Sequence, residues 1–497
     1  MGEAVMDTQR RALDGAPSPW WRRAPGPAGG VRRAGSMDGE ARPTGLAPRE
    51  VPILSTFTPE NAAGLPGTPW LVERRTAAAD AFASSPLPTE KDEVWRYSRI
   101  DRLDLDRFQP VGSSRAGGDA GPGVSDRIHA LVAGLGPRSG LVVTIDGILA
   151  TLASTAGDEQ IGLDRVADLP GGADLLGVVL GDAHDFPLLN DAFALDPVVV
   201  DIRPGAAVAD PVVIVHVVSG AAGTAVFPRT VVRAGAGAAA GVIELVVDAD
   251  TGLLADGHTD WAPGDTSPAE RLVVPVTELQ VDDDASLAYV SIQSLGSSTW
   301  QIAHQASTIG ARASLSSYAV ALGGGYARLR TDSALEGDSG SSSLRAAFIG
   351  RDDQMLDFRT LQDHRAPRTT SDLLFMGAVA DTSHSVYSGL IRVRRGAVRS
   401  DAMQTNHNLV LDEGAHADSV PNLDIEENDV KCSHGSTVGP VDEDQRYYLE
   451  SRGVEPERAE QLIVAGFFDS IADQVPLPGV RDLVGRSLAE RSGVTRG

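Results

Sequence analysis

Residues 271–296 read RLVVPVTELQVDDDASLAYVSIQSLG, in which two β-branched runs are joined by an acidic turn. Similar runs occupy residues 198–218 and 224–248, and the same texture continues to about Cys432. Such runs, separated by small turn residues at intervals of roughly ten, predict short strands. Because no long helices alternate with them, the sequence predicts one large all-β unit.

Three architectures fit this unit: a sandwich, a barrel and a parallel β-helix. Asn-Gly and Asp-Gly turns, the usual signs of hairpins, are nearly absent from the run. Small residues dominate the turns, as stacked corners require, and the run is too long for one ordinary sandwich. No strict repeat is legible. We therefore favour a mainly β fold with a right-handed parallel β-helix core, flanked by an N-terminal α/β-helical region and a C-terminal helical region.

On the N-terminal side, the sequence predicts a mixed domain with helical character over residues 51–190. The β-helix core is predicted to follow over residues 191–435. A helix is expected from Pro69 until the prolines at 86 and 88 end it. Residues 113–123 have the composition of a linker, and 141–147 that of a strand. The segment that follows the helix is expected to bury Trp95, Tyr97, Ile100, Leu103, Leu105 and Phe108.

The C-terminal flank predicts a helical domain over residues 436–497. The strand pattern ends at Cys432, and a helix follows with Asp442 as its N-cap and Gly453 as its stop. A second helix is expected from Pro456, with Ala459, Leu462, Ile463, Phe467 and Ile471 on one apolar face. A third, short helix follows the break at residues 476–479.

Composition limits the partners and the compartment. The formal net charge of −25 argues against nucleic acid or an anionic membrane as a partner, and no apolar run is long enough to span a bilayer. The single cysteine favours a reducing compartment, and we expect the cytoplasm. Residues 1–50 are rich in Arg, Pro, Gly and Ala, which predicts a disordered extension, and Met37 is an alternative start. Their acidic residues argue against a transit peptide.

Cys432 and His434 are the candidate metal ligands. As strand neighbours at i and i+2 they point to one face, so both could reach one metal ion or one interface. One thiol cannot hold an iron–sulfur cluster alone. A nucleophile with its base is a weaker interpretation, because the sequence identifies no third orienting residue. Spacing alone favours ordinary packing for both residues.

Other polar motifs favour structural roles. The histidines after residue 300 are too widely spaced for a zinc template, which favours scattered surface positions over a shared metal site: His304, His364, His384, His407, His416 and His434. Gly323–Gly325 lacks the Lys-Ser/Thr of a phosphate loop and predicts a turn. The pairs Asp352–Asp353 and Glu426–Glu427 are typical of solvated turns. We therefore expect no catalytic and no cofactor-binding residues.

A longer segment carries a family resemblance. DIEENDVKCSHGSTVGPVDEDQRYYLESRGVEPERAEQLIVAGFF, from residue 424, resembles the C-terminal signature of the SufB/SufD family of iron–sulfur cluster assembly proteins. Residues 368–393 and 401–425 resemble the family's last β-helix rungs, and residues 69–100 its N-terminal segment. The similarity runs from about Pro69 to the C-terminus. Ser436 in place of alanine, the N-terminal tail and an insertion over residues 258–271 depart from the family pattern.

The chain is more similar to SufD than to SufB. The SufB type has a scaffold cysteine where this chain has Gly414, and a Glu-containing segment in place of CSHGST. The resemblance implies a non-catalytic subunit that assembles with a SufB-like subunit and two copies of the SufC-like ATPase. It also supports the β-helix, which is the family's fold.

The resemblance assigns His434 and Cys432 to the interface with SufB, where a nascent cluster forms or iron enters. It implies a transient iron ion or iron–sulfur cluster shared with that partner, and SufC docking on the helices from Asp442 to Ile471. Flavin binding and a homodimer stay open. The alternatives are a SufB-like cluster scaffold and, from a different class, a β-helical carbohydrate-active enzyme that would need a carboxylate pair lining a groove.

Overall fold

The computed structural model describes residues 54–112, 124–157, 159–181, 185–250, 252–254 and 270–492. The predictions for residues 1–50, for the linker at 113–123 and for most of the insertion at 258–271 lie outside this part of the chain.

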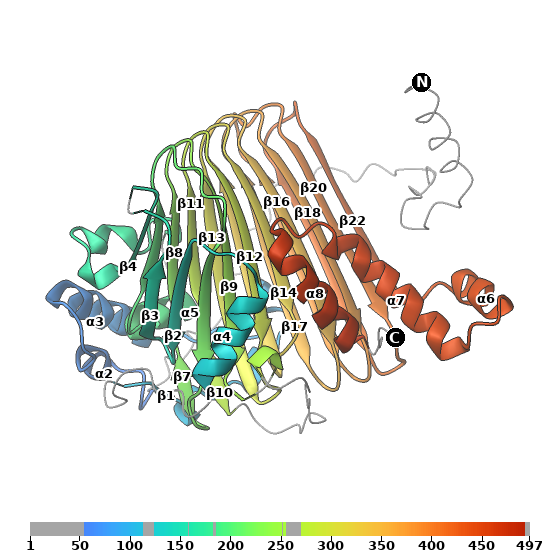
Figure 1. The fold of residues 1–497 in the computed structure, drawn as a ribbon, viewed down its shortest axis with the longest axis horizontal. Helices are drawn as coiled ribbons and strands as arrows, with labels where there is room; N and C mark the ends of the chain where they lie inside the picture. Colours follow the sequence, from blue (N-terminus) through green and yellow to red (C-terminus); the bar gives the residue numbers. More distant parts are fainter. Residues whose placement is uncertain are drawn as a thin grey trace, which may run out of the picture. The chain divides into compact units, whose positions relative to one another are not determined.

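Two long sheets form the core, and strands β11 to β22 alternate between them (Figure 1). The first sheet contains β4 (Ile161–Arg165), β5 (Val198–Ile202), β8 (Arg229–Ala234), β11 (Val276–Val281), β13 (Thr299–Ile309), β15 (Tyr326–Leu335), β17 (Met355–His364), β19 (His384–Val393) and β21 (His416–Ile425), with β1 (Gln109–Pro110), β7 (Thr224–Val226) and β10 (Arg271–Val273) beside this path. The second contains β3 (Ile148–Ser154), β2 (Gly140–Ile145), β6 (Val212–Val218), β9 (Ala239–Asp248), β12 (Ser286–Ser294), β14 (Ser314–Ala321), β16 (Ser341–Gly350), β18 (Thr370–Val379), β20 (Asp401–Val410) and β22 (Lys431–Gly439).

The strand pairing is parallel except at β2–β3 and β4–β5. Parallel strands that alternate between two sheets form a β-solenoid, which confirms the predicted parallel β-helix and excludes an antiparallel sandwich or barrel. The strand predicted at residues 141–147 is β2, and it pairs with β6. The sheets therefore begin before residue 191, where the sequence placed the start of the core.

The repeat length of the solenoid drifts along the chain. In the second sheet Ser314 pairs with Ser341, Ser341 with Thr370 and Thr370 with Asp401, at separations of 27, 29 and 31 residues. This drift explains why no strict repeat is legible. The turns before these strands share a conformation rather than a residue type, because Arg312, Ser339, Arg368 and Arg399 all have φ between 55° and 62°.

The interior between the sheets changes from apolar to polar along the solenoid. An aromatic stack runs through Phe348, Phe358, Phe375 and Tyr387, with ring centroids 4.5–5.7 Å apart. Further along, β20 places Gln404, Asn406 and Asn408 in the interior, with at most 3% of each exposed. The core therefore ends in amide side chains rather than in apolar ones.

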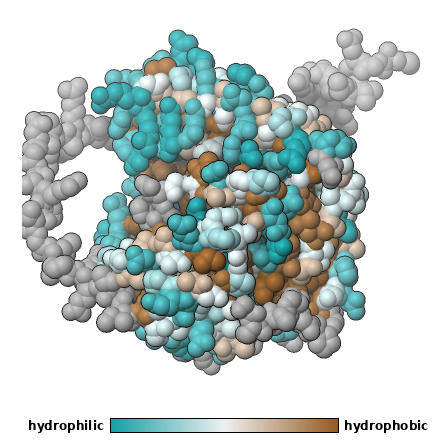
Figure 2. Space-filling model, turned by 90° about the vertical axis from the view of Figure 1, so that its left-hand side faces the viewer, coloured by the Kyte–Doolittle hydropathy of each residue, from teal (hydrophilic) through white to brown (hydrophobic). Residues whose placement is uncertain are grey.

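Helices α2 (Pro59–Ala63), α3 (Pro69–Ala83) and α5 (Phe186–Phe193) cover the early rungs, and Figure 2 views the molecule from their side. The predicted start of α3 at Pro69 is confirmed. Arg75 of α3 is fully buried and donates to the carbonyl oxygens of Ala194 and Leu195, at 2.6 Å each. Tyr97 was expected to be buried but is 45% exposed, because its positive φ turns the chain there.

The remaining helices are α4 (Val124–Gly134), α6 (Glu443–Ser451), α7 (Pro456–Ala472) and α8 (Pro478–Arg491). The Asp442 cap is confirmed, since its side chain accepts from the backbone N–H groups of Asp444 and Gln445. The predicted end of the strands at Cys432 is wrong, because β22 continues to Gly439. Leu462 is exposed, unlike the rest of the predicted apolar face.

Helices α7 and α8 lie on the outer face of the second sheet (Figure 1). The Tyr318 hydroxyl donates to the Ile471 carbonyl at 3.1 Å, and Arg345 donates to the Gln474 side chain at 2.7 Å. Among the helices of the described ranges, none is both long and apolar enough to cross a membrane.

Candidate functional site

Cys432 and His434 lie on β22, the last strand of the second sheet. In the pairing with β20, Cys432 is opposite Ala402 and His434 is opposite Gln404. Paired residues of in-register parallel strands point to the same face, and both Ala402 and Gln404 are buried in the interior. Cys432 and His434 therefore share the interior-facing side of β22, where Cys432 is half-buried and His434 is exposed.

His434 is exposed although it faces inward, because β21 and β22 end the two sheets of the described chain. The same holds for Leu423, Ile425 and Val438, which are 37%, 43% and 43% exposed and pair with buried residues of the preceding rung. We call Leu423, Ile425, Cys432, His434 and Val438 the open end of the solenoid. It is a surface of apolar side chains, one thiol and one imidazole, formed by the unstacked end of the core.

Polar groups beneath the open end lack partners within the described chain. Both amide atoms of Gln404, directly below His434, are buried without a hydrogen bond, as are Asn408 Oδ1 and Ser419 Oγ. Buried polar groups are normally paired, and an unpaired one costs about 1–3 kcal/mol. These residues were not predicted from the sequence, although polar residues alternate visibly over 404–408.

The thiol of Cys432 is held in its protonated form. Burial, followed by the negative charge of Asp401, raises the pKa of the Cys432 thiol above its ordinary value. The thiolate is the form that binds metals. Metal binding at Cys432 therefore has to displace a proton, which leaves the exposed imidazole of His434 as the more accessible ligand.

Within the described ranges, His384, His416 and Asp418 are the group of three metal-binding side chains that lie within reach of one another. Cys432 and His434 are not part of such a group. A metal site at these two residues therefore stays a prediction, and it would need further ligands from elsewhere.

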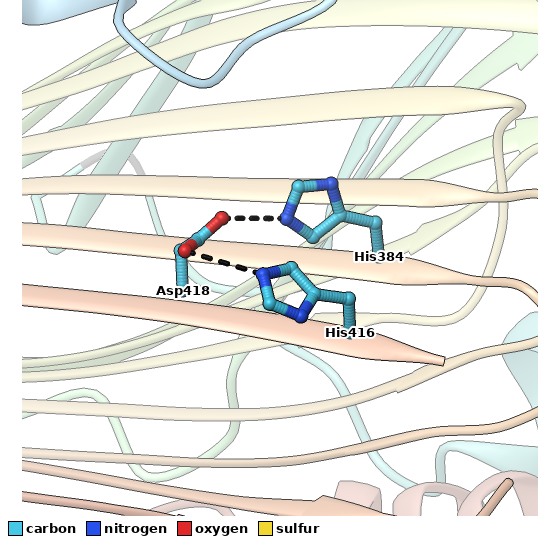
Figure 3. Close-up of side chains that lie close together, drawn as sticks. All are labelled: His384, His416 and Asp418. Carbon is cyan, nitrogen blue, oxygen red and sulfur yellow. Dashed lines mark hydrogen bonds and ion pairs between the residues drawn. The ribbon is translucent and has the colours of Figure 1, made fainter. Parts of the chain in front are cut away.

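The prediction of scattered surface histidines is wrong for several of them. His364 is fully buried, and His384 and His416 lie beside each other with ring centroids 5.0 Å apart (Figure 3). His304 contacts Asp332 at 3.1 Å. Linear spacing could not reveal these contacts, because the solenoid stacks residues that are a whole turn apart in the sequence.

His364 predicts a pH dependence of stability. Burial lowers the pKa of His364 to about 4, and its two ring nitrogens contact the hydroxyls of Thr369 and Ser371 at 2.8 Å each. The imidazole takes up a proton near pH 6.5 in the unfolded chain but only near pH 4 in the folded chain. The free energy of unfolding is therefore highest above pH 6.5 and falls as the pH is lowered toward 4. We expect His364→Gln to flatten this dependence by about 2 kcal/mol, measured as urea unfolding at pH 7 and 4.5. His129→Gln, at an exposed imidazole of α4, is the control, and equal slopes for wild type and His364→Gln would contradict the prediction.

The other polar motifs lie in turns. Gly323–Gly325 connects β14 to β15, as predicted, and Asp352–Asp353 lies between β16 and β17. Glu426, which is exposed, and Glu427, which is half-buried, directly follow β21.

Comparison with known proteins places this architecture in a family. The family described as "SUF system FeS cluster assembly, SufBD core domain" matches residues 216–467, just over half of the chain. The chain is 26% identical to the iron–sulfur cluster assembly protein SufD of Escherichia coli, over 82% of this chain and 89% of that protein. It is 29% identical to SufD of Bacillus subtilis, over 43% of this chain and 49% of the relative.

A further match is an iron–sulfur cluster assembly SufBD family protein of Mycobacterium tuberculosis, 34% identical over 44% of this chain. The matched region spans 57% of that relative's length. The matching core domain runs from within β6 through β22 into α7, and therefore includes Cys432, His434 and the open end. On this match and this fold, the chain belongs to the SufBD family of the SUF system for iron–sulfur cluster assembly.

Proposed function

We propose that this chain is the SufD-like subunit of a SUF complex. In this role it joins a SufB-like subunit through the open end, supports the entrance of iron and the formation of the nascent cluster there, and binds the SufC-like ATPase. The relatives named SufD in Escherichia coli and Bacillus subtilis support the assignment. Gly414, where the SufB type carries a cysteine, favours it over the SufB-like scaffold.

The open end is the observation that carries this proposal. It combines exposed apolar side chains, two metal ligands on one face and unpaired buried amides below them. A rung from a second solenoid would cover the apolar residues. Its own cysteine or histidine residues would complete the ligand set, so that the iron or cluster is cargo held between two chains rather than a cofactor of this one.

In this proposal the SufC-like subunit hydrolyses ATP. This chain would contribute ligands and surfaces as a non-catalytic subunit. A conformational change driven by ATP hydrolysis would reach the solenoid through α7, which accepts a hydrogen bond from Tyr318, and through Gln474 just after it, which accepts one from Arg345.

The proposal is tested by co-expressing this chain with a SufB-like and a SufC-like partner and purifying on a tag carried by this chain. We expect a stable complex containing all three, with iron and acid-labile sulfide in the reconstituted assembly. A chain that leaves both partners unbound contradicts the proposal. A chain that assembles a stable cluster by itself supports the SufB-like scaffold instead.

Helix α6 is the proposed contact with the ATPase. None of its residues is buried, and Tyr447 and Tyr448 are 73% and 58% exposed. Exposed aromatic side chains on a helix are typical anchors of protein interfaces. We expect the double substitution Tyr447→Ala, Tyr448→Ala to weaken binding of the SufC-like subunit at least about tenfold in a titration, without changing the melting temperature.

Tyr97→Ala is the matched control, because Tyr97 is an exposed tyrosine on the N-terminal part of the chain. Equal affinities of the α6 variant and the Tyr97 variant would remove α6 from the interface.

A further inference from the structure

The first sheet carries a second cluster of metal-binding side chains on its outer face. His384 of β19 pairs in register with His416 of β21, and Asp418 follows His416 by two residues. These three positions lie on one face, opposite to the interior-facing Ser385 and Tyr387. Figure 3 shows both imidazoles and the carboxylate pointing toward one another from the two strands.

The distances fit a shared ion. His384 Nε2 lies 2.8 Å from Asp418 Oδ2, and His416 Nε2 lies 3.4 Å from Asp418 Oδ1. One ligand atom from each residue lies within 4.8 Å of the others. Ligand atoms about 2.1 Å from a tetrahedral metal ion are separated by about 3.4 Å, so small side-chain rotations would close the set.

The ligand types specify a class of metal. Two imidazoles and one carboxylate are a set used by first-row divalent ions, with water in the remaining positions. The three side chains are 24%, 66% and 27% exposed for His384, His416 and Asp418, so an ion and its waters have access.

The arrangement differs from other histidine–carboxylate contacts of the chain. His304 with Asp332 and His216 with Glu244 each bring one imidazole to a carboxylate, as an ordinary hydrogen bond requires. At Asp418 a second imidazole from the next rung approaches the same carboxylate.

We propose that His384, His416 and Asp418 bind one divalent first-row transition metal ion, of the Fe(II) or Zn(II) class. The site lies on the outer face of the first sheet, whereas Cys432 and His434 face the interior from the second sheet. It is therefore separate from the open end, and it stands whether or not the chain binds a SufB-like partner.

Cobalt(II) is the probe, because its visible absorption reports histidine and carboxylate coordination. The full chain, stripped of metal with a chelator, is titrated with Co(II) by absorption spectroscopy and calorimetry. We expect one equivalent to bind at this site, and His416→Ala to weaken that binding at least about tenfold. His416→Ala is preferred to His384→Ala because His416 is the more exposed of the two.

Two control variants test whether the Co(II) ion binds at this site and not elsewhere. His304→Ala removes an imidazole from a pair with a single histidine, and the double variant Cys432→Ser, His434→Ala removes the ligands of the open end. Both are expected to retain Co(II) binding with wild-type affinity. Absence of Co(II) binding to wild type, unchanged affinity of His416→Ala, or loss of binding in the Cys432/His434 variant would overturn the proposal. Co-purification with the partners is scored separately, so failure of one proposal does not imply failure of the other.

Discussion

Alanine at position 434 is expected to lower the iron and sulfide content of the reconstituted complex at least about tenfold, because it removes the more accessible ligand of the half-site. His434 is exposed in the described chain, so the fold should not change. The measurement is iron and acid-labile sulfide per complex, with circular dichroism of the isolated chain as the check on folding.

Ser433→Ala is the matched control, since Ser433 is exposed and precedes His434 on the opposite face of β22. Cys432→Ser should have a smaller effect than His434→Ala, because burial and Asp401 keep the thiol protonated. Wild-type iron and sulfide content in His434→Ala would remove His434 from the proposed site.

Asp357→Ala is expected to destabilise the chain by about 3–5 kcal/mol, the usual cost of removing one partner from a buried charge network. The carboxylate accepts from Tyr326 at 2.9 Å, and from Arg328 and Arg359 at 2.6 Å each. Burial alone would raise the pKa of Asp357, but the two guanidinium groups and the Tyr326 hydroxyl lower it. Without the carboxylate, two cations remain almost completely buried.

The same substitution should loosen the N-terminal segment. Arg328 also donates to the Val94 carbonyl and lies 3.8 Å from the Trp95 ring centroid, and Arg359 donates to the Arg96 carbonyl. Urea unfolding measures the loss of stability, and limited proteolysis near residues 94–96 measures the loosening.

Asp372→Ala provides the comparison for this network. Asp372 is 50% exposed and pairs with Arg345, so its loss should cost less than about 1 kcal/mol. If Asp357→Ala and Asp372→Ala lower the free energy of unfolding equally, the network around Asp357 does not hold the N-terminal segment against the solenoid.

Local signals made some elements predictable from the sequence. Asp442 and Pro456 mark helix starts through their own chemistry, and α6 and α7 begin directly after Asp442 and at Pro456. The parallel β-helix could be inferred from the missing hairpin turns and the small corner residues.

The rung pairing could not be predicted in the same way. The turn positions with positive φ are occupied by residues as different as Asp284, Arg312 and Ser339, so composition does not mark them. Their spacing also varies from turn to turn, which hides the register from any fixed period.

The candidate site was predictable only in part. Cys432 and His434 could be named from their motif, but their inward direction depends on the pairing with Ala402 and Gln404. His384 and His416 are 32 residues apart and meet only because β19 and β21 are neighbours. Contacts of this kind are set by tertiary stacking, which a linear pattern does not encode.

The open end is expected to affect the soluble yield of the protein in the cell. Strands β21 and β22 each have one strand neighbour in the described chain, so one side of their backbones is available for pairing with any other strand edge. Unprotected edges favour aggregation. When a cell makes more of this subunit than of its partner, the excess chains would aggregate. We therefore expect the soluble yield of this subunit to rise with the amount of partner that is co-expressed.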